Sequence, residues 1–225
     1  MNLTIPALLD LSHTLAGEYL SHFQFPWEAL DGIKDLILTL GPALDPSEYA
    51  EPSPHVWVHK TARVAPTAFL GEPCIIGPET EVRHCAFIRG SALVGSGCVV
   101  GNSVELKNVI LFDGVQTPHY NYAGDSILGY KSHMGAGSIT SNVKSDKTRV
   151  TVQTEAEKLE TGRKKFGAIL GDHVEVGCNS VLNPGTVIGR NSSVYPLSSV
   201  RGAVPPDSIF KGPENIVRRE ERKAP

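Results

Sequence analysis

Apolar residues recur at every sixth position over a large part of this 225-residue chain. Stepping by six from position 58 meets ten apolar residues in a row: Val58, Val64, Leu70, Ile76, Val82, Ile88, Val94, Val100, Leu106 and Phe112. Because 40% of the residues are hydrophobic, such a run would arise by chance with a probability on the order of 10⁻⁴. This period is typical of a solenoid in which each turn holds three short, flat strands. We therefore predict an all-β solenoid over residues 55–205.

The phase of the repeat breaks twice. It is lost after Phe112 and returns at Tyr122, Leu128, Met134 and Thr140, and it is lost again until Leu170. The first break predicts an insertion of four residues and a loop over 113–121 that leaves the coil. The second break predicts a polar excursion over 143–166. Loops that leave a rigid scaffold often carry functional sites.

The two ends of the chain differ from the coil. Residues 5–20 and 26–41 have the apolar spacing of helices, with Pro26 suited to a first turn and Gly41 to a C-terminal cap. We predict a helical segment over 1–45 that packs on the open end of the coil or on a neighbouring subunit. A linker over 46–54 and a C-terminal tail over 206–225 complete the predicted organisation.

Composition excludes several classes of protein. The formal net charge of −3 shows no basic excess that would indicate nucleic-acid binding, and no polybasic arm or long apolar stretch indicates a membrane. The N-terminus lacks the positive region of a signal peptide, which favours the cytoplasm. The four cysteines form no CxxC pair, so we predict reduced cysteines and no structural metal.

Charged residues gather on one predicted face of the coil. Arg89 and Lys107 are separated by three hexads, which make one full turn, so they stack on neighbouring turns. Two stacked cations either clamp an anion such as a phosphate or point apart into solvent. Glu105 also faces outward, where it could orient a histidine, and His119 shares the predicted loop with Tyr122.

Three segments carry a resemblance to a known family. The segment "RGSALVGSGCVVGNSVELK" is followed by "HYNYAGDSILG", which begins twelve residues after Lys107, and then by "MGAGSITSN". Together they resemble the acetyltransferase domain of the bifunctional glucosamine-1-phosphate N-acetyltransferase and N-acetylglucosamine-1-phosphate uridyltransferase family, over roughly residues 55–205. The long polar excursion after Asn142 is similar to the one in archaeal-type sugar-1-phosphate relatives of the family. The resemblance implies a homotrimeric left-handed parallel β-helix of hexapeptide repeats, with acetyl-CoA and an amino-sugar 1-phosphate bound between subunits.

The resemblance also implies roles for single residues. His119 would be the general base, and Glu105 would orient it. Arg89, Lys107, Tyr122, His133, Asn142 and Lys147 would bind the substrate, and Ala136 and Cys178 would bind acetyl-CoA. Backbone N–H groups near Gly135, Ala136 and Gly137 would stabilise the oxyanion that forms when an amine attacks a thioester. No metal is implied for the transfer.

Departures from the family pattern leave alternatives open. His133 stands where an asparagine is usual and Val143 where a tyrosine is usual, and Lys144 competes with Lys147 for the phosphate. An acyltransferase for another acceptor, such as galactosamine 1-phosphate, therefore stays open, as does a non-catalytic trimeric β-helix that binds sugar nucleotides or proteins. The "GRKK" segment of the excursion either reaches the 3′-phosphate of CoA or is a solvated loop. No nucleotide-binding glycine loop occurs near the N-terminus, so we expect no uridyltransferase activity.

Overall fold

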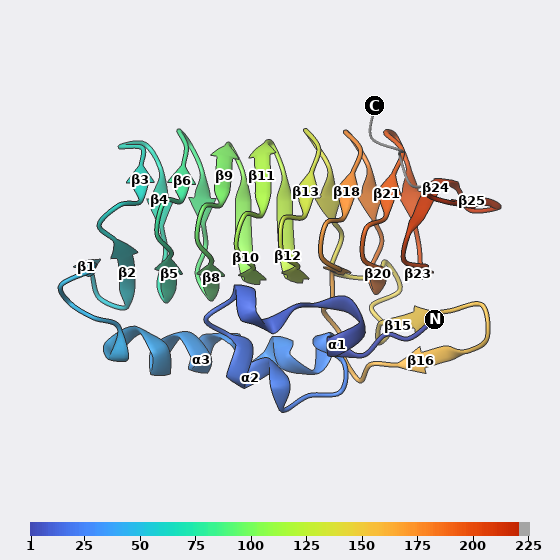
Figure 1. Cartoon of the computed structure of the whole chain (residues 1–225), viewed down its shortest axis with the longest axis horizontal. Helices are drawn as coiled ribbons and strands as arrows, with labels where there is room; N and C mark the ends of the chain where they lie inside the picture. The colour runs from blue at the N-terminus through green and yellow to red at the C-terminus, as the bar shows by residue number, and fades with distance from the viewer. Residues whose placement is uncertain (221–225) are drawn as a thin grey trace.

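The protein is a β-solenoid of about nine turns with a short N-terminal helical segment, which confirms the fold predicted from the hexads. Its structure, a computed structural model, describes residues 1–220. Successive turns pair in parallel, for example through Val58, Ile76 and Val94, which follow one another in register at intervals of three hexads. Figure 1 shows the turns side by side in one row, from β3 near one end to β24 near the other.

The coil has three faces, numbered so that the chain passes from face 1 to face 2 to face 3 and then back to face 1 of the next turn. Face 1 holds β4 (Phe69–Leu70), β7 (Phe87–Ile88), the start of β10 (Glu105–Leu111), the start of β12 (Tyr122–Leu128), β14 (Ile139–Thr140), β19 (Val181–Leu182) and β22 (Ser199–Val200). Face 2 holds β2 (Val56–His59), β5 (Cys74–Ile76), β8 (Ala92–Val94), the ends of β10 and β12, β17 (Ala168–Leu170), β20 (Thr186–Ile188) and β23 (Ala203–Val204). Because β10 and β12 run across the corner, faces 1 and 2 form one sheet.

Face 3 is the second large sheet. It holds β3 (Arg63–Val64), β6 (Glu81–Val82), β9 (Val99–Asn102), β11 (Gln116–His119), β13 (His133–Met134), β18 (Glu175–Val176), β21 (Ser193–Val194) and β24 (Ser208–Gly212). Two strands add antiparallel pairs at the ends of the coil, β1 (Tyr49–Ser53) on β2 and β25 (Asn215–Arg218) on β24. The coil therefore extends into the region predicted as a tail, whose last five residues lie outside the described residues.

The first break in the repeat is a deletion, so the prediction of a four-residue insertion was wrong. Glu105 pairs with Tyr122 and Leu111 with Leu128, so these turns are shorter than three full hexads. Each turn lacks one residue at the corner between faces 1 and 2, where Asn108 and Asp125 take φ of 54° and 48°. Asparagine and aspartate tolerate this left-handed conformation better than most residues.

The predicted loop over 113–121 is consequently part of the coil. Its β11 pairs with β9 and β13 in face 3, so the segment does not leave the scaffold. The shift in phase places Leu111, Thr117 and Ala123 inside the coil, where all three are fully buried. Tyr122 therefore points outward and is only half-buried, although the six-residue step predicted it inside.

The N-terminal segment covers face 2 and not the open end of the coil, as Figure 1 shows. It consists of α1 (Ile5–Leu8), the 3₁₀ turn η1 (Leu11–His13), α2 (Gly17–Ser21), η2 (Pro26–Gly32), α3 (Ile33–Leu40) and η3 (Gly41–Ala43). The predicted helix over 5–20 is broken because the backbone N–H of Asp10 donates to the buried carboxylate of Asp172 in the coil (2.8 Å) and does not continue a helix.

A column of apolar side chains explains the position of the helical segment. The middle residue of each face 2 strand points outward, yet Ile75, Leu93 and Ile110 are at most 1% exposed. Helix α3 contacts β8 and β10, and η2 contacts β12. Exposing an apolar column to water is unfavourable, so it must pack against another apolar surface. The apolar side of the helical segment provides that surface.

The polar excursion forms a hairpin that packs on the coil. It leaves after Asn142 and contains β15 (Thr151–Gln153) and β16 (Lys158–Glu160), which pair antiparallel. Its fully buried residues, Val150, Val152 and Phe166, anchor it. The excursion is therefore a packed element, whereas the sequence left a solvated loop as one of two alternatives.

The hairpin lies against Gly185, at the corner between faces 1 and 2, whereas Gly162 belongs to the excursion itself. A Cβ at Gly185 would stand 2.6 Å from the carbonyl oxygen of Thr151, whereas a Cβ at Gly162 would meet no atom within 4 Å. Both glycines have positive φ, 82° and 72°. Gly185→Ala is expected to lower the free energy of unfolding by about 2–4 kcal/mol, and Gly162→Ala by about 1 kcal/mol, in urea titrations. Equal losses would show that β15 does not pack against Gly185.

Candidate active site

Face 1 has candidate site residues at both of its corners. At the corner with face 3, His119, Ala136 and Cys178 occupy equivalent places in successive turns. The backbone N–H of Gly137 donates to the carbonyl of His119 (3.0 Å), and that of Asn179 donates to the carbonyl of Ala136 (2.8 Å). His119 and Cys178 are exposed and Ala136 is half-buried, so this corner presents the three residues to solvent.

The two predicted phosphate-binding cations lie at the other corner, one turn apart. Arg89 Nη1 donates to Glu105 Oε1 (2.8 Å), and Lys107 Nζ binds both oxygens of Asp125 (2.9 and 3.1 Å). The hydrogen bond and charge of Glu105 raise the pKa of the Arg89 guanidinium above its ordinary value. Each cation therefore has its own carboxylate, and Glu105 binds Arg89 where the resemblance predicted an orienting contact with His119.

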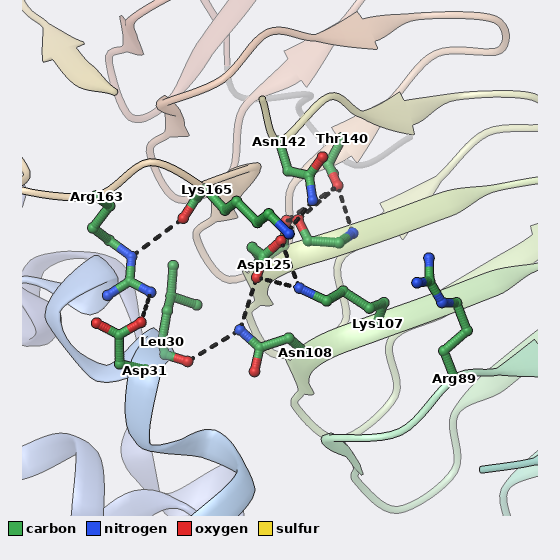
Figure 2. A network of polar contacts seen from close by, with 12 residues as sticks. Leu30, Asp31, Arg89, Lys107, Asn108, Asp125, Thr140, Asn142, Arg163 and Lys165 are labelled. Carbon is green, nitrogen blue, oxygen red and sulfur yellow. Dashed lines mark hydrogen bonds and ion pairs between the residues drawn. The ribbon is translucent and has the colours of Figure 1, made fainter. Parts of the chain in front are cut away.

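Asp125 is the centre of the polar network at this corner. It is 3% exposed, and its carboxylate accepts hydrogen bonds from Lys107, Asn108 Nδ2 (2.9 Å) and Asn142 Nδ2. Asn108 also donates to the carbonyl oxygen of Leu30 (3.0 Å), which ties the helical segment to the corner. Figure 2 shows these side chains converging on Asp125. A buried carboxylate with this many donors holds their positions firmly.

Tyr122 lies between the two corners on face 1. Asn142 Nδ2 donates to its hydroxyl oxygen (3.2 Å), so Tyr122 joins the Asp125 network. Burial raises the pKa of the phenol, and the nearby carboxylates of Asp125 and Glu105 raise it further. The hydroxyl therefore keeps its proton at neutral pH and is available as a donor. Its side chain crosses Gly124, where a Cβ would stand 2.3 Å from the hydroxyl oxygen.

A pocket of about 450 Å³ adjoins this corner on the side of the helical segment. Lys107, Asn108 and Asp125 line it from the coil, Leu30 and Asp31 line it from the helical segment, and the end of the excursion contributes Gly162, Arg163, Lys164 and Lys165. Figure 2 shows the side chain of Lys165 reaching toward Asp125. Cationic side chains outnumber carboxylates here, which suits an anionic ligand.

Several predicted site residues lie elsewhere. His133 is on face 3, where its Nδ1 lies 2.9 Å from Glu175 Oε2. Lys147 is exposed in the excursion and does not line the pocket, whereas Lys164 and Lys165 do. The backbone N–H groups of Gly135 and Gly137 already donate to carbonyl oxygens, which leaves Ala136 as the candidate oxyanion donor of the three.

Sequence reasoning missed Asp125 and Asn108, and it left open whether Arg163 and Lys165 bind a phosphate or are solvated. Asp125 follows Asn108 at one position fewer than three hexads, a spacing that a strict step of six conceals. Their residue types were the available signal, because aspartate and asparagine favour the left-handed corners of a coil. Arg163 and Lys165 belong to the "GRKK" segment, and its place beside Lys107 depends on how the hairpin folds.

Comparison with known proteins decides the family. The family model described as the GMPPB C-terminal domain matches residues 72–192, which is more than half of the chain. The chain belongs to this family. Relatives of the domain include the bifunctional sugar-1-phosphate nucleotidylyltransferase/acetyltransferase of Sulfurisphaera tokodaii, 33% identical over 106 residues, covering 47% of this chain and 26% of the relative. The bifunctional protein GlmU of Methanococcus aeolicus is 35% identical over 118 residues, covering 52% and 28%.

The family domain is only one part of these relatives, since the chain spans about a quarter of their length. Its β-helix is related to the acetyltransferase part of the GlmU family. Among solved structures, the chain is similar to a mutant of AntD, an N-acyltransferase from Bacillus cereus, in complex with dTDP and coenzyme A. It is 19% identical, covers 74% of this chain and 82% of its own, and has a TM-score of 0.37.

Two kinds of feature are absent from residues 1–220. None of the helices there is long and apolar enough to cross a membrane. No cluster of three or more histidine, cysteine, aspartate or glutamate side chains suited to a metal ion occurs in the same part of the chain.

Proposed function

We propose that this domain is an acetyl-CoA-dependent N-acetyltransferase that acts on glucosamine 1-phosphate or a related amino-sugar 1-phosphate. One observation carries the proposal: the two corners of face 1 present complementary groups. His119, Ala136 and Cys178 stack at one corner, and the cations Arg89 and Lys107 lie at the other. An acceptor held by its phosphate at the cationic corner extends across Tyr122 toward His119.

The chemistry follows from the residue types. An ammonium is no nucleophile, so the 2-amino group must lose a proton before it attacks the thioester, and a neutral imidazole at His119 is suited to accept that proton. The new amide bond forms as the thioester carbon–sulfur bond breaks, and the CoA thiolate leaves. Ala136 lies one turn after His119, next to Gly137, whose N–H donates to the carbonyl of His119. We propose that the Ala136 N–H donates to the oxyanion formed on the way. Tyr122, as a protonated phenol, donates to the sugar or the acetyl group.

Exposed aromatic residues support an assembly with sites between subunits. Phe69 and Phe87 are 59% and 43% exposed on face 1, and their ring centroids lie 5.6 Å apart, next to Glu105 in register. Adjacent exposed aromatics favour a protein partner. We therefore propose a homotrimer that binds acetyl-CoA and the acceptor in clefts bordered by face 1, in the cytoplasm.

We propose that these residues carry acetyl transfer and not uridylyl transfer, because the family match covers the coil. The test is release of free thiol from acetyl-CoA with glucosamine 1-phosphate, with galactosamine 1-phosphate and without acceptor. Release that requires one of the two sugars is the expected result and identifies the acceptor. Absence of acceptor-dependent release would overturn the proposal in favour of a binding module. Pyrophosphate released from UTP and N-acetylglucosamine 1-phosphate would contradict the absence of uridylyl transfer.

A further inference from the structure

The interior of the coil is open at the end where the first turn lies. The inward positions of that turn are accessible to solvent, since Val64 is 36% exposed and Val58 and Leu70 are half-buried. Their partners in the next turn are at most 1% exposed: Ile76, Val82 and Ile88. The opposite end is closed, because β25 pairs with β24 and Phe210 of β24 is 3% exposed. The apolar core is therefore uncovered at the first turn.

A hollow of about 610 Å³ lies over the open end. The inward residues Val58, Val64 and Leu70 line it, and Ala50 and Pro52 of β1 line it from one side. Strand β1 pairs with β2 and lies one strand beyond the first turn, so it forms a ridge beside the hollow. Figure 1 shows β1 and β3 at the same end of the coil. The open end thus combines a ridge over face 2 with an adjacent apolar hollow.

The strands at this end have unpaired edges. Within residues 1–220, β3 pairs with β6 alone and β4 pairs with β7 alone, so the outer edges of both strands have no partner strand. The outer edge of β1 is also unpaired in this part of the chain, since β1 pairs with β2 alone. An exposed strand edge is a template for pairing with a strand of another chain. The open end therefore offers backbone hydrogen-bonding groups as well as apolar surface.

The edges of β1 and β3 carry opposite charges. Glu51 lies on β1 and Arg63 lies on β3, and both side chains are exposed. Among the described residues, neither side chain forms an ion pair. Glu51 Oε1 accepts a hydrogen bond from the backbone N–H of His55 (2.8 Å), which leaves the negative charge without a cation. One end of the coil therefore holds an acidic edge and a basic edge side by side.

We propose that the open end binds the open end of a second copy of this chain about a two-fold axis perpendicular to the coil. The ridge β1 of each copy fills the hollow of the other and lies along β3, so that Glu51 meets Arg63 of the partner subunit. A two-fold contact requires one surface that complements itself, and this end has both the ridge with its hollow and the two opposite charges. The contact uses none of the three faces, so it goes beyond the proposed function and leaves face 1 free.

The test is the mass of the particle in solution, measured by light scattering and by sedimentation over a range of protein concentrations. The variants of the open end are Val64→Asp, Arg63→Glu and the double variant Arg63→Glu with Glu51→Arg. These three side chains are exposed, so their replacement leaves the buried core intact. Val217→Asp is the matched control, because Val217 is 37% exposed and lies on β25 at the opposite end.

We expect the wild type and Val217→Asp to have twice the mass of Val64→Asp, whatever the number of chains that associate through face 1. Arg63→Glu should weaken the end contact about tenfold to a hundredfold, and the double variant should restore it. Equal masses for the wild type and Val64→Asp would overturn the proposal. A double variant that stays dissociated would overturn the pairing of β1 with β3. The mass does not depend on turnover, so a failure of acetyl transfer leaves this test unaffected.

Discussion

His119→Ala is expected to lower the rate of acetyl transfer by about 10²- to 10⁴-fold, the usual contribution of a general base. Affinity for the acceptor phosphate should change little, because Arg89 and Lys107 lie at the opposite corner of face 1. The measurement is thiol release under saturating acetyl-CoA, combined with calorimetric binding of the acceptor. A split between a low rate and an intact affinity identifies a group that acts in the chemical step.

His84→Ala is the matched control for this variant. His84 lies at the same corner as His119 two turns earlier, since Asn102 pairs with His119 and donates to the carbonyl oxygen of His84 (3.0 Å). It is exposed, like His119. We expect His84→Ala to keep the wild-type rate. Equal rates for the wild type and the His119 variant, or equal losses in both variants, would rule out His119 as the base.

Ile110→Asp is expected to lower the free energy of unfolding by about 4 kcal/mol or more, because it places an unpaired carboxylate in the apolar interface between face 2 and the helical segment. Ile110 is fully buried, although it points away from the interior of the coil, since helix α3 packs on β10. Urea unfolding followed by circular dichroism provides the measurement.

Ser199→Asp provides the comparison for the buried substitution. Ser199 also points outward from its strand, on face 1, and it is exposed. Its replacement should change stability by less than about 0.5 kcal/mol. If both variants unfold at the wild-type urea concentration, the helical segment does not cover face 2 in solution.

The sequence contained more information on the helical segment than its periodicity alone suggested. The coil follows from the step of six, but the same strands show a second pattern: face 2 strands have three consecutive apolar residues, as in "CII", "ALV", "VIL" and "AIL". Strands of face 3 alternate, as in "EV" and "HM". A strand buried on both sides needs a continuous apolar run, so these triplets indicate a covered face.

The candidate site was only partly predictable for a different reason. The spacing of Arg89 and Lys107 correctly predicted that the two cations stack on neighbouring turns. Their ion-pair partners depend on side-chain geometry: Arg89 pairs with Glu105, and Lys107 pairs with Asp125. Because the breaks in the repeat are single-residue deletions and not an insertion, the chain stays in the coil there and His119 is part of strand β11. The pocket depends on Leu30, Asp31 and Arg163, which are brought together by tertiary packing that no local pattern encodes.

The cover on face 2 changes how the coil should fold and unfold. Turns of an ordinary solenoid contact only their neighbours, so such proteins can fray from one end in steps. Here the helical segment reaches from β8 to the turn that begins at Asp172, whose backbone N–H donates to the carbonyl of Leu8. Contacts between residues that lie 162 or more positions apart in the sequence form late in folding and slow it. The helical segment therefore couples turns that are distant along the coil. We expect the middle of the coil to unfold as one cooperative unit.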